Sequence, residues 1–261
     1  MIDTHCHLTF PDLIGRVDEV IQHAVAHGVD RMISIGTTPD DAANAQRIAE
    51  ASPHVWFAAG VHPHYSPNVS LDQLPRLAEF ALHERCVAFG EMGVDYHSPD
   101  PPKEDQHAMF QAQLEVVKYS RITKPIIIHC RKAVDDTLSI IEGAGIPGDR
   151  FVFHCCTEPP EEVRKILDLG AMISFTGIVT YKNAPEVRES AKLVPLDRIM
   201  TETDSPYLAP EPHRKVRPNE PRYVTATTAF LAKLREVELE SFIDQLDRNA
   251  ERFFGIPVSV G

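Results

Sequence analysis

Two kinds of segment alternate along the chain, and this alternation restricts the fold more than any other feature. Short runs rich in apolar and β-branched residues precede longer segments in which apolar residues recur at helical spacing. Such repetition is typical of β-then-α units that build a parallel sheet. We expect strands at Met1–Thr4, Arg31–Ile35, Val55–Gly60, Cys86–Gly90, Lys124–His129, Phe151–His154, Ala171–Ser174 and Ile199–Glu202.

Segments with helical periodicity follow these strands. We expect helices near 13–27, 39–51, 71–84, 104–121, 133–143, 160–169, 184–193, 221–235 and 239–254. Eight uninterrupted units predict an α/β fold closed into a TIM (β/α)8 barrel, and 261 residues suit a single domain of this kind over 1–261. No glycine-rich dinucleotide-binding motif follows the first strand, which disfavours a Rossmann fold.

Composition narrows the expected compartment and partners. The chain shows no export signal and no stretch apolar enough to span a membrane, so no membrane association is expected. Its five cysteines are odd in number and form no CxxC pair, which favours reduced thiols in a cytoplasmic protein. With 38 acidic and 26 basic residues the net charge is −12, so any contact with nucleic acid must be local.

Histidine and carboxylate residues stand at the ends of the predicted strands. Alone, each has an ordinary structural explanation, such as a helix cap or a histidine at a strand end. Together they occupy equivalent points of successive units, and the carboxyl ends of barrel strands converge on the rim where active sites of this fold lie. The residues are His5 and His7 after the first strand, His62 and His64 after the third, Glu91 after the fourth, His129 and His154 ending the fifth and sixth, and Asp204 after the eighth.

Imidazole and carboxylate ligands without thiolates suit zinc, manganese or magnesium ions. We hypothesise that Glu91 bridges two divalent ions. The pair His5 and His7 would bind one ion, and the pair His129 and His154 would bind the other.

Asp204 is expected to orient the attacking water, accept its proton and contact the first ion. Asp204 and Glu91 are therefore the expected catalytic residues. His62 and His64 are candidates for binding phosphate or a third ion, and a purely structural part is the alternative.

Four further residues are candidate substrate contacts. Arg131 would clamp a phosphate, with a structural ion pair as the alternative. Tyr207 would stack on a base. Asp95 and Tyr96 would contact substrate or support the ligands. The proline-rich segment 206–218 also carries a His-Arg-Lys-x-Arg cluster, which is either a local site for a nucleic-acid backbone or ordinary solvated loop charge.

Six ordered motifs give the chain a specific resemblance to the TatD family of metal-dependent deoxyribonucleases, within the amidohydrolase-like barrels. They are Asp3-Thr4-His5-Cys6-His7-Leu8, Gly60-Val61-His62-Pro63-His64, Gly90-Glu91-Met92-Gly93-Val94-Asp95-Tyr96, Ile128-His129-Cys130-Arg131, Phe153-His154, and Thr201-Glu202-Thr203-Asp204-Ser205-Pro206-Tyr207-Leu208.

The resemblance implies metal ligands at His5, His7, Glu91, His129, His154 and Asp204, with Glu91 in place of the modified lysine of many amidohydrolases. It also implies DNA as the substrate, attacked as a single strand or from 3′ ends, with zinc or magnesium-like ions as cofactors. One departure is Cys155-Cys156 after His154, where the family more often carries Phe-Ser-Gly.

Two other functions remain open from the sequence. One is hydrolysis of amide, lactone or small phosphate-ester substrates, since fold does not fix substrate. The other is a metal-dependent binding protein without catalysis. The sequence does not decide the oligomeric state.

Overall fold

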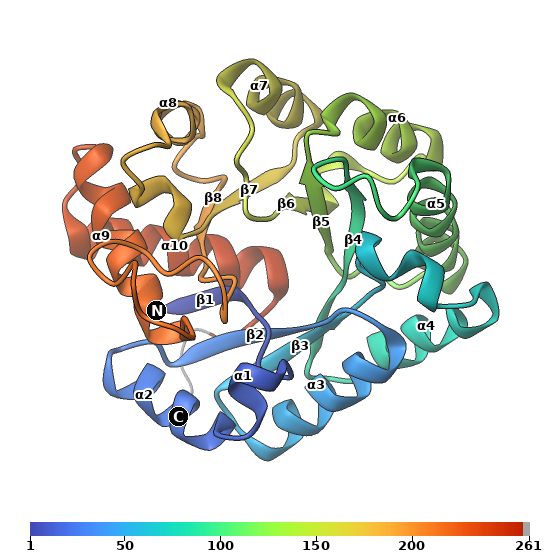
Figure 1. Cartoon of the computed structure of the whole chain (residues 1–261), viewed down its shortest axis with the longest axis horizontal. Coiled ribbons are helices and arrows are strands. Elements are labelled where there is room, and N and C mark those ends of the chain that lie inside the picture. Colours follow the sequence, from blue (N-terminus) through green and yellow to red (C-terminus); the bar gives the residue numbers. More distant parts are fainter. Residues whose placement is uncertain (258–261) are drawn as a thin grey trace.

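Eight parallel strands, each paired with its neighbour in sequence, form the centre of the structure. The computed structural model describes residues 1–257. Figure 1 shows the strands enclosed by helices, which confirms the expected TIM barrel. The strands are β1 (Ile2–Cys6), β2 (Arg31–Gly36), β3 (Val55–Ala59), β4 (Cys86–Asp95), β5 (Ile126–Arg131), β6 (Phe151–Phe153), β7 (Met172–Phe175) and β8 (Ile199–Thr201).

Helices occupy the connections between the strands (Figure 1). The α-helices are α1 (Pro11–Ile14), α2 (Val17–Ala26), α3 (Pro39–Ala51), α4 (Pro75–Ala81), α5 (Lys103–Ser120), α6 (Val134–Ala144), α7 (Pro160–Leu169), α8 (Pro185–Leu193), α9 (Val224–Leu234) and α10 (Leu239–Phe254). Short 3-10 turns are η1 (Pro63–Asn68), η2 (Leu71–Gln73), η3 (Gly148–Arg150), η4 (Gly177–Thr180) and η5 (Pro221–Tyr223). No helix within residues 1–257 is long and apolar enough to cross a membrane.

Three expected boundaries were wrong. The helix expected at 13–27 is divided at Gly15 and Arg16, because Arg16 leaves the helical region with φ −140° and ψ 29°. The helix expected at 71–84 begins only at Pro75, whose missing N–H suits a first helical turn and not an interior. The fourth strand was expected to end at Gly90, yet β4 continues to Asp95.

The seam between β1 and the chain after β8 closes the barrel. The amide of Asp204 donates to the carbonyl of His5 at 2.9 Å, and the amide of His7 donates to the carbonyl of Ser205 at 2.8 Å. The buried carboxylate of Asp3 accepts two more hydrogen bonds, from the amide of Thr203 at 2.9 Å and from its hydroxyl at 2.6 Å. Chain segments about two hundred residues apart are thus joined by the backbones of the candidate ligands themselves and by residues next to them.

Two apolar clusters hold the barrel together. The larger one packs the outward faces of the strands against the helices. The smaller one fills the barrel with residues such as Ile33, Trp56 and Ile127, and it includes Ala250 and Phe254 of α10. At the amino end of β2, the buried Arg31 forms ion pairs with Asp247 and Glu251 of α10. The candidate ligands lie at the opposite end, where the strands reach their carboxyl ends.

Two glycines of β4 bring the candidate ligands close together. Gly93 pairs with His129 of β5 and has φ +146°, which is accessible to glycine and strained for other residues. A Cβ atom on Gly93 would lie 2.0 Å from the carbonyl oxygen of His129. Gly90 has φ +115°, and its Cβ would lie 2.5 Å from the carbonyl oxygen of Ile127. Because these two positions lack side chains, the backbone of β4 can lie close to the backbone of β5.

The variant Gly93→Ala should lower the free energy of unfolding by at least about 2 kcal/mol, because overpacking and a strained φ each cost on the order of 1–3 kcal/mol. Urea denaturation measures this change. The matched variant Gly143→Ala lies in α6, where an added Cβ meets no atom within 4 Å. That variant should stabilise the protein by about 0.5–1 kcal/mol. Equal stability of the two variants would contradict the assigned role of Gly93.

Candidate metal centre

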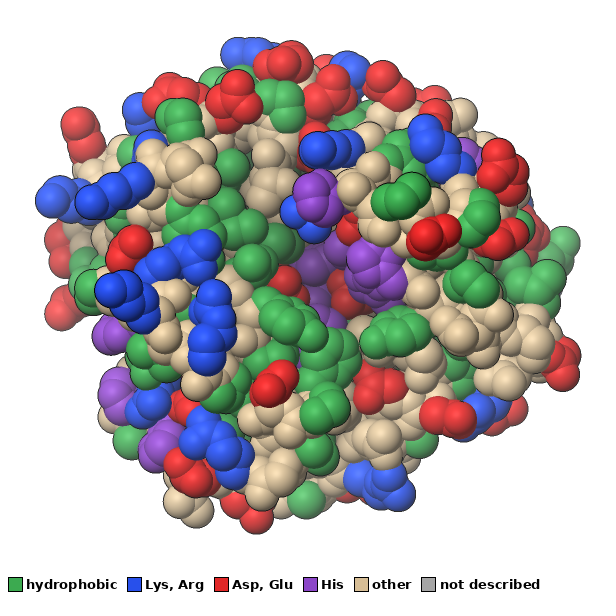
Figure 2. Space-filling model, viewed as in Figure 1, with side chains coloured by type: hydrophobic (Ala, Val, Ile, Leu, Met, Phe, Trp, Pro, Cys, Tyr) green, Lys and Arg blue, Asp and Glu red, His purple; other side chains and the backbone are tan. Residues whose placement is uncertain are grey.

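A cavity opens at the carboxyl ends of the strands. Its volume is about 390 Å³. Figure 2 shows histidine and acidic side chains at the bottom of this hollow and hydrophobic side chains around it. The lining residues are His7, Phe10, Thr37, His62, His64, Tyr65, Glu91, Asp95, His129, Cys130, Arg131, His154, Cys155, Thr157, Ile178, Asp204, Tyr207 and Leu208.

Glu91 lies inside β4, not after it as expected from the sequence, and its buried carboxylate is surrounded by imidazoles. Its Oε2 atom is 2.7 Å from Nε2 of His154 and 3.5 Å from Nδ1 of His129. Its Oε1 atom is 3.6 Å from Nε2 of His7. One carboxylate thus faces imidazoles from three other strand ends.

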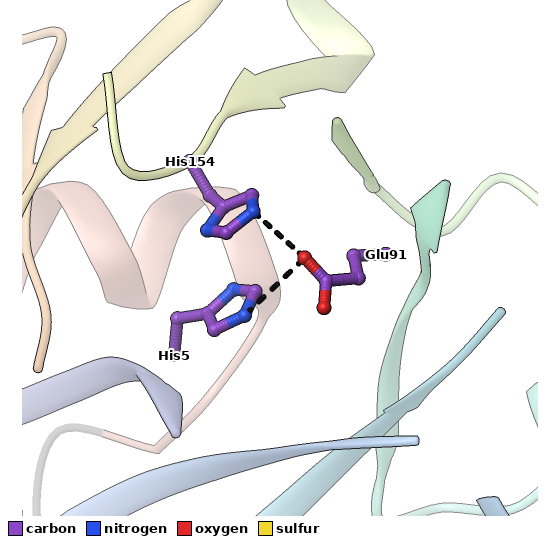
Figure 3. A group of neighbouring side chains, drawn as sticks. All are labelled: His5, Glu91 and His154. Atoms are coloured by element: carbon purple, nitrogen blue, oxygen red, sulfur yellow. Dashed lines mark ion pairs between the residues drawn. The ribbon is translucent and has the colours of Figure 1, made fainter. Parts of the chain in front are cut away.

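His5 in β1 and His154 after β6 are far apart in the sequence and meet at Glu91. Their rings are stacked, with centroids 3.9 Å apart and planes 5° apart. Figure 3 shows both imidazoles directing a nitrogen at the same carboxylate oxygen. The Nε2 atom of His5 lies 3.6 Å from Glu91 Oε2. Both histidines are buried, so their contacts are with protein groups and not with bulk water.

Asp204 completes the other side of the group. Its Oδ1 atom lies 3.2 Å from Nε2 of His7 and 3.8 Å from Nε2 of His5. The backbone of Asp204 has φ +53°, a region that non-glycine residues rarely adopt. Such strain is often found at functional sites, where surrounding contacts hold it. Here the seam hydrogen bond from the Asp204 amide to His5 is one of those contacts.

Several buried polar atoms of this group make no hydrogen bond within residues 1–257. They are both ring nitrogens of His5, Nδ1 of His7, Nδ1 of His154 and Oε2 of Glu91. Two of them have close charged neighbours without the geometry of a hydrogen bond: Glu91 Oε2 is 2.7 Å from His154 Nε2, and His154 Nδ1 is 3.4 Å from Glu202. Buried polar atoms without partners are costly and rare. Three sets of donor atoms lie within 4.8 Å of one another: His5 with Glu91 and His154, His5 with His7 and Asp204, and His62 with Glu91 and His129. The arrangement therefore fits divalent cations.

The protonation states of Glu91 and His5 suit cation binding. Burial alone would raise the pKa of Glu91, but the imidazoles of His62, His154 and His5 outweigh it and hold that pKa well below its usual value. Burial lowers the pKa of His5 well below its usual value, and the neighbouring His154 lowers it further. A charged carboxylate beside a neutral imidazole is the state that a metal ion requires of its ligands. At His7, His129 and His154 burial lowers the pKa but neighbouring carboxylates outweigh it and raise the pKa, so a cation bound there would displace protons.

Two carboxylates behind the imidazoles orient them. Oδ2 of Asp95 lies 2.9 Å from Nε2 of His129 and 3.4 Å from Nε2 of His64. Oε1 of Glu202 lies 3.4 Å from Nδ1 of His154. A carboxylate behind a ligating histidine fixes the ring orientation and raises its basicity. Asp95 was a candidate from the sequence, whereas Glu202 was missed.

Glu202 is fixed in place by two short contacts. It accepts hydrogen bonds from the amide of Cys155 and from the hydroxyl of Ser174, both at 2.6 Å. Asp3 was also missed, and it anchors Thr203 across the seam and also accepts from the amide of His5. Burial raises the pKa of Asp3 to about 8. The only sequence signal for either residue was its position within a motif that also carries a ligand.

Of the other candidate substrate residues, two line the cavity and one does not. Arg131 and Tyr207 line the cavity and are exposed. Within residues 1–257 Arg131 forms no ion pair, so the structure does not support the alternative role of Arg131 in a structural ion pair. Tyr96 does not line the cavity, because its hydroxyl is directed to Asp136 and His107.

His62 and His64 are both at the cavity. His62 uses Nδ1 to accept from the amide of His64 at 3.0 Å, which leaves its other nitrogen for the donor set around Glu91. The cysteines remain outside these donor sets. Cys6 points into the sheet, where its Sγ contacts the carbonyl oxygen of Ile33, and all five cysteines are free.

Comparison with known proteins places these features in a family. The family model described as TatD related DNase matches residues 2–255. The chain is 35% identical to the uncharacterized metal-dependent hydrolase YabD of Bacillus subtilis, over 98% of this chain and 99% of that protein. It is 34% identical to a protein of Klebsiella pneumoniae named 3'-5' ssDNA/RNA exonuclease TatD, over 99% of each chain.

A solved structure supports the same grouping. The crystal structure of YjjV, a TatD homolog from Escherichia coli, superposes on this chain with a TM-score of 0.91 and 28% sequence identity, covering 98% of each chain. The family match spans both the barrel and the residues around Glu91. With its eight-stranded barrel and its buried histidine and carboxylate cluster, the chain belongs to the TatD family of metal-dependent hydrolases.

Proposed function

We propose that this protein is a nuclease that cleaves phosphodiester bonds in single-stranded DNA from the 3′ end. The observation that carries the proposal is the set of buried donor atoms without partners around Glu91, at the bottom of an open cavity. The name of the Klebsiella relative, a 3'-5' exonuclease of single-stranded DNA and RNA, supports the choice of substrate.

The residues around Glu91 would hold two divalent ions. Glu91 would contribute to both sites, because its two oxygens face different imidazoles: Oε1 faces His7, and Oε2 faces His154 and His129. His5 shares donor sets with both His7 and His154, so the expected division into two separate histidine pairs is not the only arrangement that the geometry allows. His62 joins Glu91 and His129 as a further donor.

Divalent ions bound there would polarise the phosphoryl oxygens and lower the pKa of a water molecule. The chain's own residues supply positioning and proton transfer. Asp204 faces the cavity beside His7, and its carboxylate would accept the proton of the attacking water. Arg131 would hold a phosphate oxygen through its guanidinium, which has no competing ion pair within residues 1–257.

Apolar and aromatic side chains would receive the base. Phe10 stacks on His7 with ring centroids 4.4 Å apart, and Tyr207 packs edge-on against Phe10 at 6.1 Å. Tyr207 is 52% exposed, so its ring has a free face at the mouth of the cavity. Stacking is worth about 1–3 kcal/mol per base and tolerates any sequence. An unpaired terminal nucleotide offers such a face, whereas a base within a duplex does not.

Glu91→Gln and Asp204→Asn should each abolish or strongly reduce cleavage of a 3′-labelled single-stranded oligonucleotide supplied with Mg²⁺, Mn²⁺ or Zn²⁺. Loss of a proton acceptor at Asp204 should lower kcat by about 10²–10⁴-fold. The control Glu142→Gln alters an exposed glutamate of α6 and should retain activity. Robust cleavage by both cavity variants would refute the proposal. Activity confined to amide, lactone or small phosphate-ester substrates would refute the choice of bond.

Removal of divalent ions should lower the melting temperature, because an ion that binds only the folded state stabilises it by mass action. Dialysis against a chelator, then addition of Zn²⁺ or Mn²⁺, should lower and restore Tm in differential scanning calorimetry. The ion-dependent increase should be lost in Glu91→Gln and kept in Glu142→Gln. An unchanged Tm in wild-type protein at every concentration up to millimolar would argue against a metal centre.

Glu202→Gln should weaken divalent-ion binding about 10–100-fold, because the carboxylate that faces His154 would no longer raise its basicity. Calorimetric titration of the ion-free protein measures this affinity. The amide side chain retains an oxygen for the amide of Cys155, so a large loss of folding stability is not expected. If ion affinity matched the wild type, Glu202 would have only a packing role.

A further inference from the structure

The segment between β8 and α9 carries positive charge that the catalytic proposal does not use. Arg214, Lys215 and Arg217 are exposed. Arg217 donates only to backbone carbonyls of the same segment, and within residues 1–257 none of the three pairs with a carboxylate. Figure 2 shows Lys and Arg side chains gathered over this segment, on the face into which the cavity opens.

The segment 207–218, here called the cationic segment, is fixed to the barrel by hydrogen bonds and a cation–π contact. The side-chain amide of Asn219 donates to the carbonyls of Thr203 and Tyr207. The amide of Glu211 donates to the hydroxyl of Thr180 at 2.8 Å. The guanidinium of Arg214 lies 3.9 Å above the ring centre of Tyr181. Charges held in this way lose little conformational freedom when they bind a ligand.

The segment is also continuous with the cavity. Asp204 just before it and Tyr207 and Leu208 at its start line the cavity wall. The three cations follow on the same segment, where Glu211 is the single acidic residue between 207 and 218. Figure 2 shows Lys and Arg side chains on the face into which the cavity opens, so a strand that leaves the cavity over this segment would approach positive charge. Because the whole chain has a net charge of −12, this local excess of positive charge would attract a polyanion to this part of the surface.

We propose that Arg214, Lys215 and Arg217 form a second contact site for the phosphate backbone of a single-stranded nucleic acid whose end occupies the cavity. This inference rests on the proposed function and adds a preference for longer strands. The cations do not line the cavity, so a dinucleotide bound there would not contact them. A strand of about twelve nucleotides would extend well beyond the cavity and place several phosphates on them. Binding of the longer strand is consequently more sensitive to salt.

The test measures binding by fluorescence anisotropy with fluorescein-labelled phosphorothioate oligothymidylates of two and twelve nucleotides, between about 50 and 200 mM NaCl. Replacing all three cations, in Arg214→Gln/Lys215→Gln/Arg217→Gln, should make the slope of log Kd against log salt for the longer strand shallower by about 2. The affinity ratio between the long and short strands should fall about tenfold at the lower salt concentration.

Two further variants separate the local site from net charge and from misfolding. Lys118→Gln/Lys233→Gln/Arg248→Gln removes the same charge from exposed positions away from the cavity. Lys118 and Lys233 are in the last turns of α5 and α9, and Arg248 is in the middle of α10. It should keep the wild-type slope. Arg214→Lys/Arg217→Lys keeps the charge and should keep the slope as well.

The outcomes distinguish this inference from the proposed function. Equal salt slopes for the triple cation variant and its charge-matched control would overturn the second contact site. Failure of the wild-type protein to cleave any unmodified strand, with a slope that still depends on Arg214, Lys215 and Arg217, would overturn the nuclease proposal and leave the contact site standing. Cleavage by the wild-type protein, with equal salt slopes for the wild type and the triple cation variant, would support the nuclease proposal and overturn the second contact site.

Discussion

The buried carboxylate of Glu91 is the group around which the rest of the site is organised. Taking an ionised carboxylate out of water costs several kcal/mol unless other groups compensate for the loss. Here compensation comes from imidazoles on β1, β5 and the chain after β6, all of which lie near the Oε2 atom of Glu91. The parallel barrel makes this arrangement accessible because its strands end on a common rim.

Negative charge recurs behind the imidazoles. Asp95 supports His129, and Glu202 supports His154, so carboxylates stand on both sides of these rings. This alternation makes the imidazoles better electron-pair donors and concentrates negative potential in the cavity. Such a cavity favours cations and repels phosphates. A polyanionic substrate therefore depends on positive groups at the mouth, among which are Arg131 and the cationic segment.

The sequence predicted the barrel and the meeting of the six candidate ligands at its rim, because both depend on local pattern. Strands such as Ile126–Arg131 appear as apolar runs, and His129 and His154 stand visibly near their ends. The extent of β4 was not predictable in the same way. Gly90, Glu91 and Gly93 resemble the end of a strand, whereas the glycines in fact permit close pairing with β5.

Longer-range features could not be predicted from pattern. The roles of Asp3 and Glu202 depend on which residues face each other across the seam and between β7 and β8. The grouping of His5 with His154 depends on ring orientation inside the barrel, which strand spacing does not specify. Tyr96 shows the opposite case: it follows Asp95 in a ligand-bearing motif, yet its side chain leaves the cavity for His107 and Asp136.

The seam between β1 and the chain after β8 has a consequence for the order in which the protein matures. His5 and His7 belong to one edge of the seam, and Asp204 belongs to the other. While the last strand is undocked, the ligand set is split between the two ends of an open sheet. The candidate metal centre is therefore assembled only when the barrel closes, and a nascent chain that still lacks its final strand cannot bring the whole candidate ligand set together.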